Sequence, residues 1–178
     1  VKRAESGLNL VIGVAKPVGM TSHDVVSPVR RILGKKRVGH TGTLDPLASG
    51  VLPVCVGSAA RLNPYLTAED KRYEVAVAFG AATDTDDAQG QVIRTGAVPA
   101  RLYDEGFARQ FVSGLVGRSR QLPPVYSAIK VNGKKACDEA RKGNVVHLEP
   151  RDVEVRSARL VRIVREEGTL AWQVAFDV

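Results

Sequence analysis

The sequence predicts an α+β protein with a mixed, mostly antiparallel sheet and flanking helices. Strand-like segments with alternating or β-branched apolar residues are interleaved with segments of helical period. Near the C-terminus two strand-like segments follow each other directly, whereas a doubly wound fold needs regular alternation of strands and helices. The length suits one domain spanning residues 1–178.

The first segments predict a strand followed by a helix. Residues 8–14 are apolar and β-branched, as in a buried strand. Thr21 or Ser22 can cap a helix that Gly34 ends. Pro28 falls inside the helical pattern and predicts a kink or a late helix start.

A second strand and a short helix are expected next. Residues 51–56 predict the strand, in which Pro53 requires an edge or irregular position because proline cannot donate to the ladder. Ser58 can then cap a short helix that continues to Leu66. Pro64 is expected to disturb that helix.

The middle of the chain contains the clearest strand, at residues 71–79, where apolar and polar side chains alternate. Its apolar face holds Tyr73, Val75, Val77 and Phe79. Residues 80–90 predict a loop with aspartates that cap turns; a metal site is the alternative, although the spacing is not that of an EF-hand. The later expected elements are a strand at 91–94, a helix at 104–116, a loop at 118–124, a strand at 126–131, a helix at 134–142, and strands at 152–164 and 169–178.

Charge favours a polyanionic partner, with nucleic acid the first candidate. The net charge is +7 and the pI is near 9.7, although a merely basic protein would look the same. Basic runs at 30–31, 35–37 and 134–135 flank glycine-containing turns. The apolar runs are too short for a bilayer, and the two cysteines lack zinc-site spacing, so we expect a protein of the reducing cytoplasm that binds no membrane.

The glycine-rich stretch at residues 38–51 is the strongest candidate for a site. It carries one histidine, His40, and one aspartate, Asp45, between a basic run and an apolar run. Helix capping is the usual role of an aspartate before proline, and a lone histidine is more often a structural donor. However, a carboxylate held among cations stays ionised, as a nucleophile or general base must.

Tyr73 follows the basic pair Lys71 and Arg72 on the predicted strand. It can be a core aromatic of an alternating strand. Alternatively, its ring can stack on a base beside a pair of residues that bind phosphate.

Five motifs occur in order along the chain. They are Lys16-Pro17-x-Gly19-Met20-x-Ser22, Gly39-His-Thr-Gly-Thr-Leu-Asp-Pro-Leu-Ala-Ser-Gly50, Lys71-Arg72-Tyr73, Thr83-Asp84-Thr85-x-Asp87-x-x-Gly90 and Pro123-x-x-Tyr126-Ser127-Ala128-x-Lys130-x-x-Gly133. Together they resemble the TruB-type tRNA pseudouridine synthases, from about Leu10 to the chain end. The His-Thr-Gly-Thr-Leu-Asp-Pro block is highly specific.

The resemblance implies the pseudouridine synthase catalytic-domain fold and isomerisation of uridine 55 in the T-loop of tRNA. Asp45 matches the family's essential aspartate, His40 and Tyr73 match positions that shape the pocket, and the tyrosine stacks on the uracil. RNA binding is assigned to Lys16, Lys71, Arg72 and Arg141, although the charge of Arg141 at the C-terminus of the expected helix could be purely structural. The reaction would need no metal or redox cofactor, the partner would be the T-arm stem-loop, and a monomer is expected. Whether the carboxylate attacks the sugar, adds to the base or removes a sugar proton stays open.

This sequence departs from the family pattern in two places. Cys137 stands where the family commonly has tyrosine, which puts the local RNA contact or packing in doubt. The chain also stops at Val178, where the family's Lys-Gly-Thr-Tyr-Ile-Arg motif would begin. That motif supplies a second pocket tyrosine and the arginine that pairs with the aspartate, so we expect an N-terminal part of the catalytic domain that lacks the C-terminal RNA-binding domain.

Other functions remain open at this stage. A non-catalytic RNA-binding or tRNA-folding module would keep the basic surface without needing Asp45. A hydrolase of N-glycosides usually needs two carboxylates, and no second acid accompanies Asp45 in its loop. A third alternative is that the chain belongs to another branch of the family, which works on a guide-RNA complex.

We predict that the 178-residue chain by itself is nearly inactive, because Asp45 would lack its arginine partner and part of its pocket. The measurement is tritium release from 5-tritiated uridine in a T-arm stem-loop. Full turnover by this chain would contradict the expectation.

Overall fold

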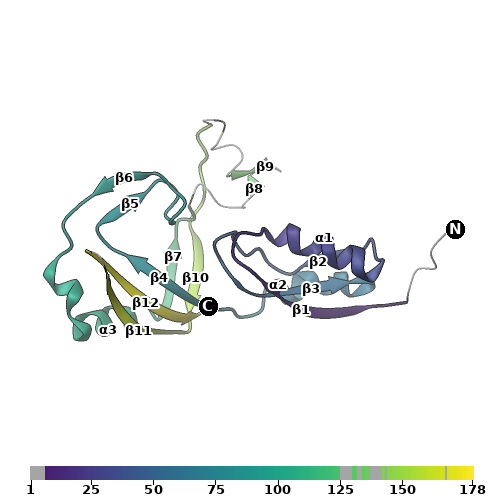
Figure 1. The fold of residues 1–178 in the computed structure, drawn as a ribbon, viewed down its shortest axis with the longest axis horizontal. Helices are drawn as coiled ribbons and strands as arrows, with labels where there is room; N and C mark the ends of the chain where they lie inside the picture. Colours follow the sequence, from purple (N-terminus) through teal and green to yellow (C-terminus); the bar gives the residue numbers. More distant parts are fainter. Residues whose placement is uncertain (1–6, 125–129, 132–133, 137–141, 143, 167) are drawn as a thin grey trace. The chain divides into compact units, whose positions relative to one another are not determined.

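The computed structural model describes residues 7–124, 130–131, 134–136, 142, 144–166 and 168–178 (Figure 1). The chain divides into two compact units, Val1–Glu69 and Asp70–Val178, and each is described by itself. Both units combine antiparallel strands with helices, which confirms the predicted α+β class. No helix among the described residues is long and apolar enough to cross a membrane.

The first unit packs a helix against a three-stranded antiparallel sheet with the order β1-β3-β2. Val25 and Val26 of the helix are buried against Leu52, Val54 and Val56 of the central strand. Its elements are β1 (Leu10–Lys16), α1 (Ser22–Leu33), β2 (Val38–His40), β3 (Gly50–Val56), the 3-10 helix η1 (Gly57–Leu62) and α2 (Asn63–Thr67).

Both predicted ends of α1 are confirmed. The Thr21 hydroxyl accepts the Asp24 N–H at 3.1 Å, and the Asp24 carboxylate accepts the Thr21 N–H at 2.9 Å, which forms a capping box. Gly34 ends the helix with φ of 61°, a conformation that favours glycine. Pro28 lies inside the helix, so the prediction of a late start was wrong.

Pro53 lies on the central strand and not at an edge, so of the two expected positions the irregular one is found, at the residue where pairing of β3 with β2 has stopped. The strand tolerates it because of where β2 stops. Pro53 accepts the Thr41 N–H at 3.0 Å through its carbonyl, which therefore points toward β2. A strand residue directs its N–H and C=O to the same side, so the donor that proline lacks would also have pointed there. The β2 ladder ends at His40, which pairs with Val54. β2 therefore has no residue opposite Pro53 whose carbonyl would need the missing N–H.

The predicted helix after β3 is two shorter elements. Ser58 does not cap it: no side chain caps η1, and the Ser58 N–H donates to the Asn9 side chain at 2.7 Å. Pro64 occupies the first turn of α2, where its missing N–H costs no helical hydrogen bond. Proline therefore separates two short helices instead of disturbing one.

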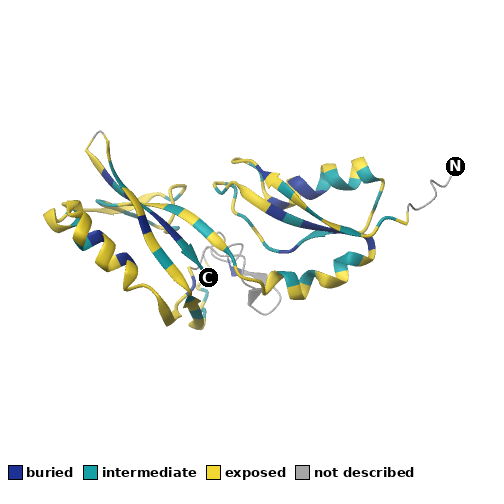
Figure 2. Cartoon of the chain, turned by 90° about the horizontal axis from the view of Figure 1, so that it is seen from below, coloured by how far each residue is buried: buried dark blue, intermediate teal, exposed yellow. Residues whose placement is uncertain are grey.

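In the second unit, α3 packs against a three-stranded antiparallel sheet with the order β11-β12-β4. Figure 2 shows the buried residues of this unit along β12 and on one side of α3. The alternation predicted for β12 is confirmed, whereas that of β4 holds for Tyr73 and Val75 but not for Val77, which is 42% exposed. Trp172, in the core, donates its indole N–H to the Leu102 carbonyl at 2.9 Å. The elements are β4 (Arg72–Ala78), β5 (Ala81–Thr83), β6 (Val92–Thr95), η2 (Ala100–Tyr103), α3 (Glu105–Ser113), β7 (Gly117–Gln121), β8 (Lys130–Val131), β9 (Lys134–Lys135), β10 (Arg151–Val155), β11 (Ser157–Glu166) and β12 (Thr169–Asp177).

Several polar strands of this unit were not predicted. The loop expected at 118–124 contains β7, which pairs with β10, and its residues are exposed on both faces, so no apolar alternation marks it. The single strand expected at 152–164 is divided between β10 and β11. Lys134–Lys135 pairs with Lys130–Val131 where a helix was expected. Residues 126–129 and most of 137–142 of these predictions lie outside the described residues.

The aspartates of the predicted loop cap turns, as expected. The Asp84 carboxylate accepts the Gln91 N–H at 2.8 Å, and the Asp87 carboxylate accepts the Gln89 N–H at 2.9 Å. Gly90 is needed beside them, because a Cβ there would lie 2.5 Å from the Asp84 carboxylate oxygen. Only the start of the segment differs from the prediction, since β5 forms there and pairs with β6.

Candidate active site

The loop that carries Asp45 leaves the sheet where β2 ends. Thr41, the first residue after β2, is buried and donates its N–H to the Pro53 carbonyl. The chain re-enters the sheet at Gly50, the first residue of β3. Between these points Asp45 itself is exposed. Both ends of the loop are therefore fixed by the sheet, while the carboxylate is accessible to a ligand.

The turn between β1 and α1 holds the middle of this loop. The Gly19 N–H donates to the Pro46 carbonyl at 2.7 Å. The Ser22 hydroxyl donates to the Leu44 carbonyl at 3.1 Å and accepts the Leu44 N–H at 2.9 Å. These bonds reach Leu44 and Pro46, the residues on either side of Asp45. The turn of the first sequence motif is therefore hydrogen-bonded to the loop of the second.

Lys16 is a third contact between the same segments. Its ammonium group donates to the carbonyls of Ala48 at 2.5 Å and Pro17 at 2.9 Å. Lys16 is 1% exposed, so in this conformation it stabilises the loop backbone. The predicted RNA contact of Lys16 stays a prediction, and burial of the side chain argues against it.

His40 is half-buried at the end of β2 and belongs to the same unit as Asp45. Its Nδ1 lies 2.7 Å from the Gly42 carbonyl, so that nitrogen carries the proton and Nε2 can accept. The Asn63 side chain donates to the His40 carbonyl at 3.0 Å. The ring and the backbone of His40 are thus both positioned by neighbours in the loop and in α2.

The basic run between α1 and β2 lies in the same unit as the loop. Gly57, at the start of η1, donates to the Arg37 carbonyl at 2.8 Å, which places η1 and its Arg61 next to this run. Five cations in or near this run form no ion pair within the described part of the chain, so their charge is available to an anionic partner. The cations are Arg31, Lys35, Lys36, Arg37 and Arg61.

Tyr73 and its basic neighbours lie together in the second unit, at the start of β4. Tyr73 is half-buried and faces Phe176 across the strand pair, with ring centroids 6.2 Å apart. The Arg72 guanidinium forms two hydrogen bonds with the Asp177 carboxylate, at 2.6 and 3.0 Å. Lys71 exchanges backbone hydrogen bonds with Val178. An RNA contact by Arg72 would have to compete with this ion pair, and it stays a prediction.

The predicted site residues thus fall into two groups. Lys16, His40 and Asp45 are in the first unit, and the segment from Lys71 to Tyr73 is in the second. Arg141 lies outside the described residues. Ser22 and Gly19 were not predicted as site residues, and only their place in the first motif could have indicated their contacts with the loop.

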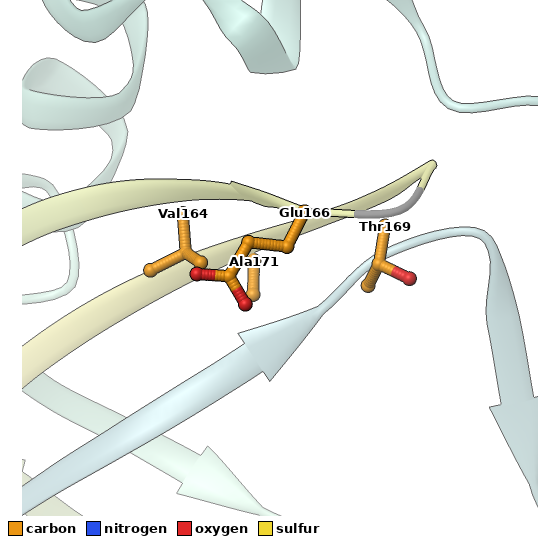
Figure 3. A pocket seen from close by; sticks show the side chains of 4 residues that line it. All are labelled: Val164, Glu166, Thr169 and Ala171. Carbon is orange, nitrogen blue, oxygen red and sulfur yellow. The ribbon is translucent and has the colours of Figure 1, made fainter.

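A pocket of about 520 Å³ lies at the β11–β12 hairpin, away from these candidates in the sequence (Figure 3). Its wall contains one carboxylate, from Glu166, and one hydroxyl, from Thr169, beside two aliphatic side chains. None of the described candidate residues lines it. We assign it no role in the site.

An exposed aspartate on a glycine-rich loop held by the sheet, in a unit whose cations at 35–37 form no ion pair among the described residues, is typical of an enzyme that uses a carboxylate on an anionic substrate. Residues 30–178 match the family described as TruB family pseudouridylate synthase (N terminal domain), so the chain belongs to that family. The match contains His40, Asp45 and Tyr73.

The curated relatives are longer than this chain. It is 48% identical to the tRNA pseudouridine synthase B of Caldanaerobacter subterraneus subsp. tengcongensis, over 85% of this chain and 53% of that protein. It is 42% identical to the enzyme of the same name from Bacillus subtilis, over 92% of this chain and 53% of that protein. The chain therefore spans about half the length of these relatives.

Solved structures support the fold. One chain from a crystal structure of a Cbf5-Nop10-Gar1 complex matches with a TM-score of 0.58 and 27% identity, over 94% of this chain and 39% of that chain. A second match, with a TM-score of 0.56 and 24% identity, comes from the structure of an H/ACA RNP bound to a substrate RNA containing 2'-deoxyuridine. These likenesses confirm the predicted pseudouridine synthase catalytic-domain fold.

The Arg72–Asp177 pair predicts a pH-dependent change. Hydrogen bonds from Arg72 and then Ser157 lower the pKa of Asp177 from 3.8 to about 2. Because the folded-state pKa is lowered, the pair's contribution to stability is present above about pH 4 and is lost as the pH falls through about 2.

Arg72→Gln should raise the pKa of Asp177 toward 3.8, measured by carbon-detected NMR titration of the carboxyl group. The control is Arg162→Gln, which removes an exposed guanidinium bonded to Gln173 in the same sheet. A pKa of Asp177 that is unchanged by Arg72→Gln would contradict the assignment.

Proposed function

We propose that this chain carries the aspartate-bearing half of a tRNA pseudouridine synthase, an isomerase that converts uridine 55 in the T-loop of tRNA to pseudouridine. The observation that carries the proposal is an exposed Asp45 on a loop held at both ends by the sheet, within a segment that matches the family. The tRNA substrate follows the name shared by relatives at 41–48% identity, and the position, uridine 55, follows the family resemblance of the sequence.

The reaction rearranges bonds within one nucleoside. The bond between C1′ and N1 of uracil breaks, the base rotates, and a bond between C1′ and C5 forms. The proton on C5 is released and N1 acquires one, so atoms balance without an oxidant or reductant. In this proposal Asp45 is the catalytic carboxylate, and the attack on the sugar, the addition to the base and the removal of a sugar proton are its three candidate roles.

The target base must leave its stack to reach Asp45. The roles proposed for Tyr73 and His40 follow from the family resemblance alone: stacking on the displaced uracil for Tyr73 and shaping of the pocket for His40. The unpaired cations of the first unit bind the phosphates of the T-arm without reading sequence, as is typical of backbone contacts. Lys71, Arg72 and Arg141 are proposed as further RNA contacts.

The T-arm stem-loop of tRNA is the proposed partner, bound by a monomer in the cytoplasm. The second candidate function is a non-catalytic RNA-binding or tRNA-folding module, which the same unpaired cations would support. The two proposals differ in whether the carboxylate of Asp45 is needed for a product.

We expect Asp45→Asn to abolish tritium release from 5-tritiated uridine in a T-arm stem-loop, with a loss of at least 1,000-fold, roughly the effect of removing a nucleophile. Binding of the stem-loop should change little, because the substitution removes no cation. The measurement uses the complete gene product.

The matched control is Asp86→Asn. Asp86 is another exposed loop aspartate, and its φ of 59° suits asparagine equally well. It should leave both activity and binding unchanged. Product formation by Asp45→Asn at the rate of the unsubstituted protein would refute the enzymatic proposal. If the unsubstituted protein and Asp45→Asn both bind the RNA and neither forms product, the binding module is favoured.

A further inference from the structure

We infer that Ser22 is a positioning residue for the reaction at Asp45, acting through the backbone of Leu44. This inference rests on the proposed function. Its basis is that one buried hydroxyl makes hydrogen bonds to both polar backbone groups of the residue before the aspartate.

The two hydrogen bonds of Ser22 fix two successive peptide planes. The Leu44 N–H belongs to the peptide between Thr43 and Leu44, and the Leu44 carbonyl belongs to the peptide between Leu44 and Asp45. The second plane also contains the N–H of Asp45. Ser22 therefore fixes the orientation of the peptide group that precedes the Cα of Asp45.

The plane on the other side of Asp45 is held as well. The Asp45 carbonyl accepts the Ala48 N–H at 3.0 Å, and the Pro46 carbonyl accepts the Gly19 N–H at 2.7 Å. Proline at position 46 further restricts the backbone of the residue before it. With both neighbouring planes bonded, the carboxylate retains only its own two side-chain torsions, which is what a preorganised catalytic group requires.

Ser22 is itself fixed in place. It is the first residue of α1, between Thr21 and Asp24 of the capping box, and it is 2% exposed. The Leu44 side chain packs against the core of the first unit, so the residue between Ser22 and Asp45 has little freedom to shift. Water cannot easily replace a hydroxyl at so buried a position, and its loss leaves the Leu44 N–H without a partner.

The experiment compares Ser22→Ala with two variants of the same helix in the complete gene product. Thr21→Ala removes the helix cap without touching Leu44 directly, and Ser27→Ala removes a hydroxyl that bonds only the His23 carbonyl, at 3.2 Å. Single-turnover formation of pseudouridine in a T-arm stem-loop gives a rate constant and an amplitude. With saturating protein, a variant that is only destabilised has a lower thermal midpoint and an unchanged rate constant, whereas a misplaced carboxylate lowers the rate constant.

We expect Ser22→Ala to lower the rate constant by roughly 10- to 100-fold, the scale of a shift of about 1 Å at a reacting group. The dissociation constant for the stem-loop should stay within about twofold. Thr21→Ala should lower the thermal midpoint and leave the rate constant unchanged, and Ser27→Ala should change neither quantity.

An unchanged rate constant in Ser22→Ala, with an active unsubstituted protein, would overturn this inference and leave the proposed function standing. An equal loss of rate constant in Thr21→Ala would also overturn it, since the effect would then come from the helix. An inactive unsubstituted protein would instead contradict the proposed function, and this inference with it.

Discussion

The hydrogen bonds between the 16–22 turn and the 44–48 loop are the constraint on which the candidate site depends. They come from a lysine ammonium, a glycine N–H and a serine hydroxyl, and they reach Ala48, Pro46 and Leu44 in turn. A glycine-rich loop loses more conformational entropy on ordering than most segments do. These contacts hold the stretch from Leu44 to Ala48, which lies between the two points where the sheet holds the loop.

The sheet of the first unit makes this arrangement possible. Pro53 lacks a donor on the side of the central strand that faces β2, and the β2 ladder stops at His40. The chain therefore leaves the sheet at Thr41 and crosses to the turn before α1, where the capped helix presents Ser22. Pro53, which the sequence suggested would disturb the strand, thus lies opposite Thr41, where the loop that carries Asp45 begins.

Elements with a local physical signal could be predicted from the sequence. Thr21 and Gly34 mark the ends of α1 because a cap and a left-handed glycine are short-range features. The apolar faces of β4 and β12 follow from alternation, and they meet in the core around Trp172. Asp45 could be proposed as the reacting carboxylate from its neighbours in the chain and from the family resemblance, and that role stays a prediction.

The remaining features depend on contacts between distant residues. β7 has arginine and serine at its centre and pairs with β10, in which Val153 and Val155 are half-buried, so the strand character of β7 comes from its partner strand. Burial of Lys16 likewise depends on the carbonyl of Ala48, 32 residues away, and no local pattern reveals it. Ser22 resembled an ordinary capping residue in the sequence, whereas the cap is Thr21 and the Ser22 hydroxyl bonds Leu44.

The most direct test of the account is a structure of the complete gene product bound to a T-arm stem-loop. The target uridine should be turned out of its stack, with a carboxylate oxygen of Asp45 within about 3.5 Å of the bond between ribose and base. Ser22 should remain bonded to Leu44 in that complex. A target uridine that stays stacked in the RNA loop, with Asp45 facing solvent or protein alone, would contradict the assignment of Asp45 as the reacting carboxylate.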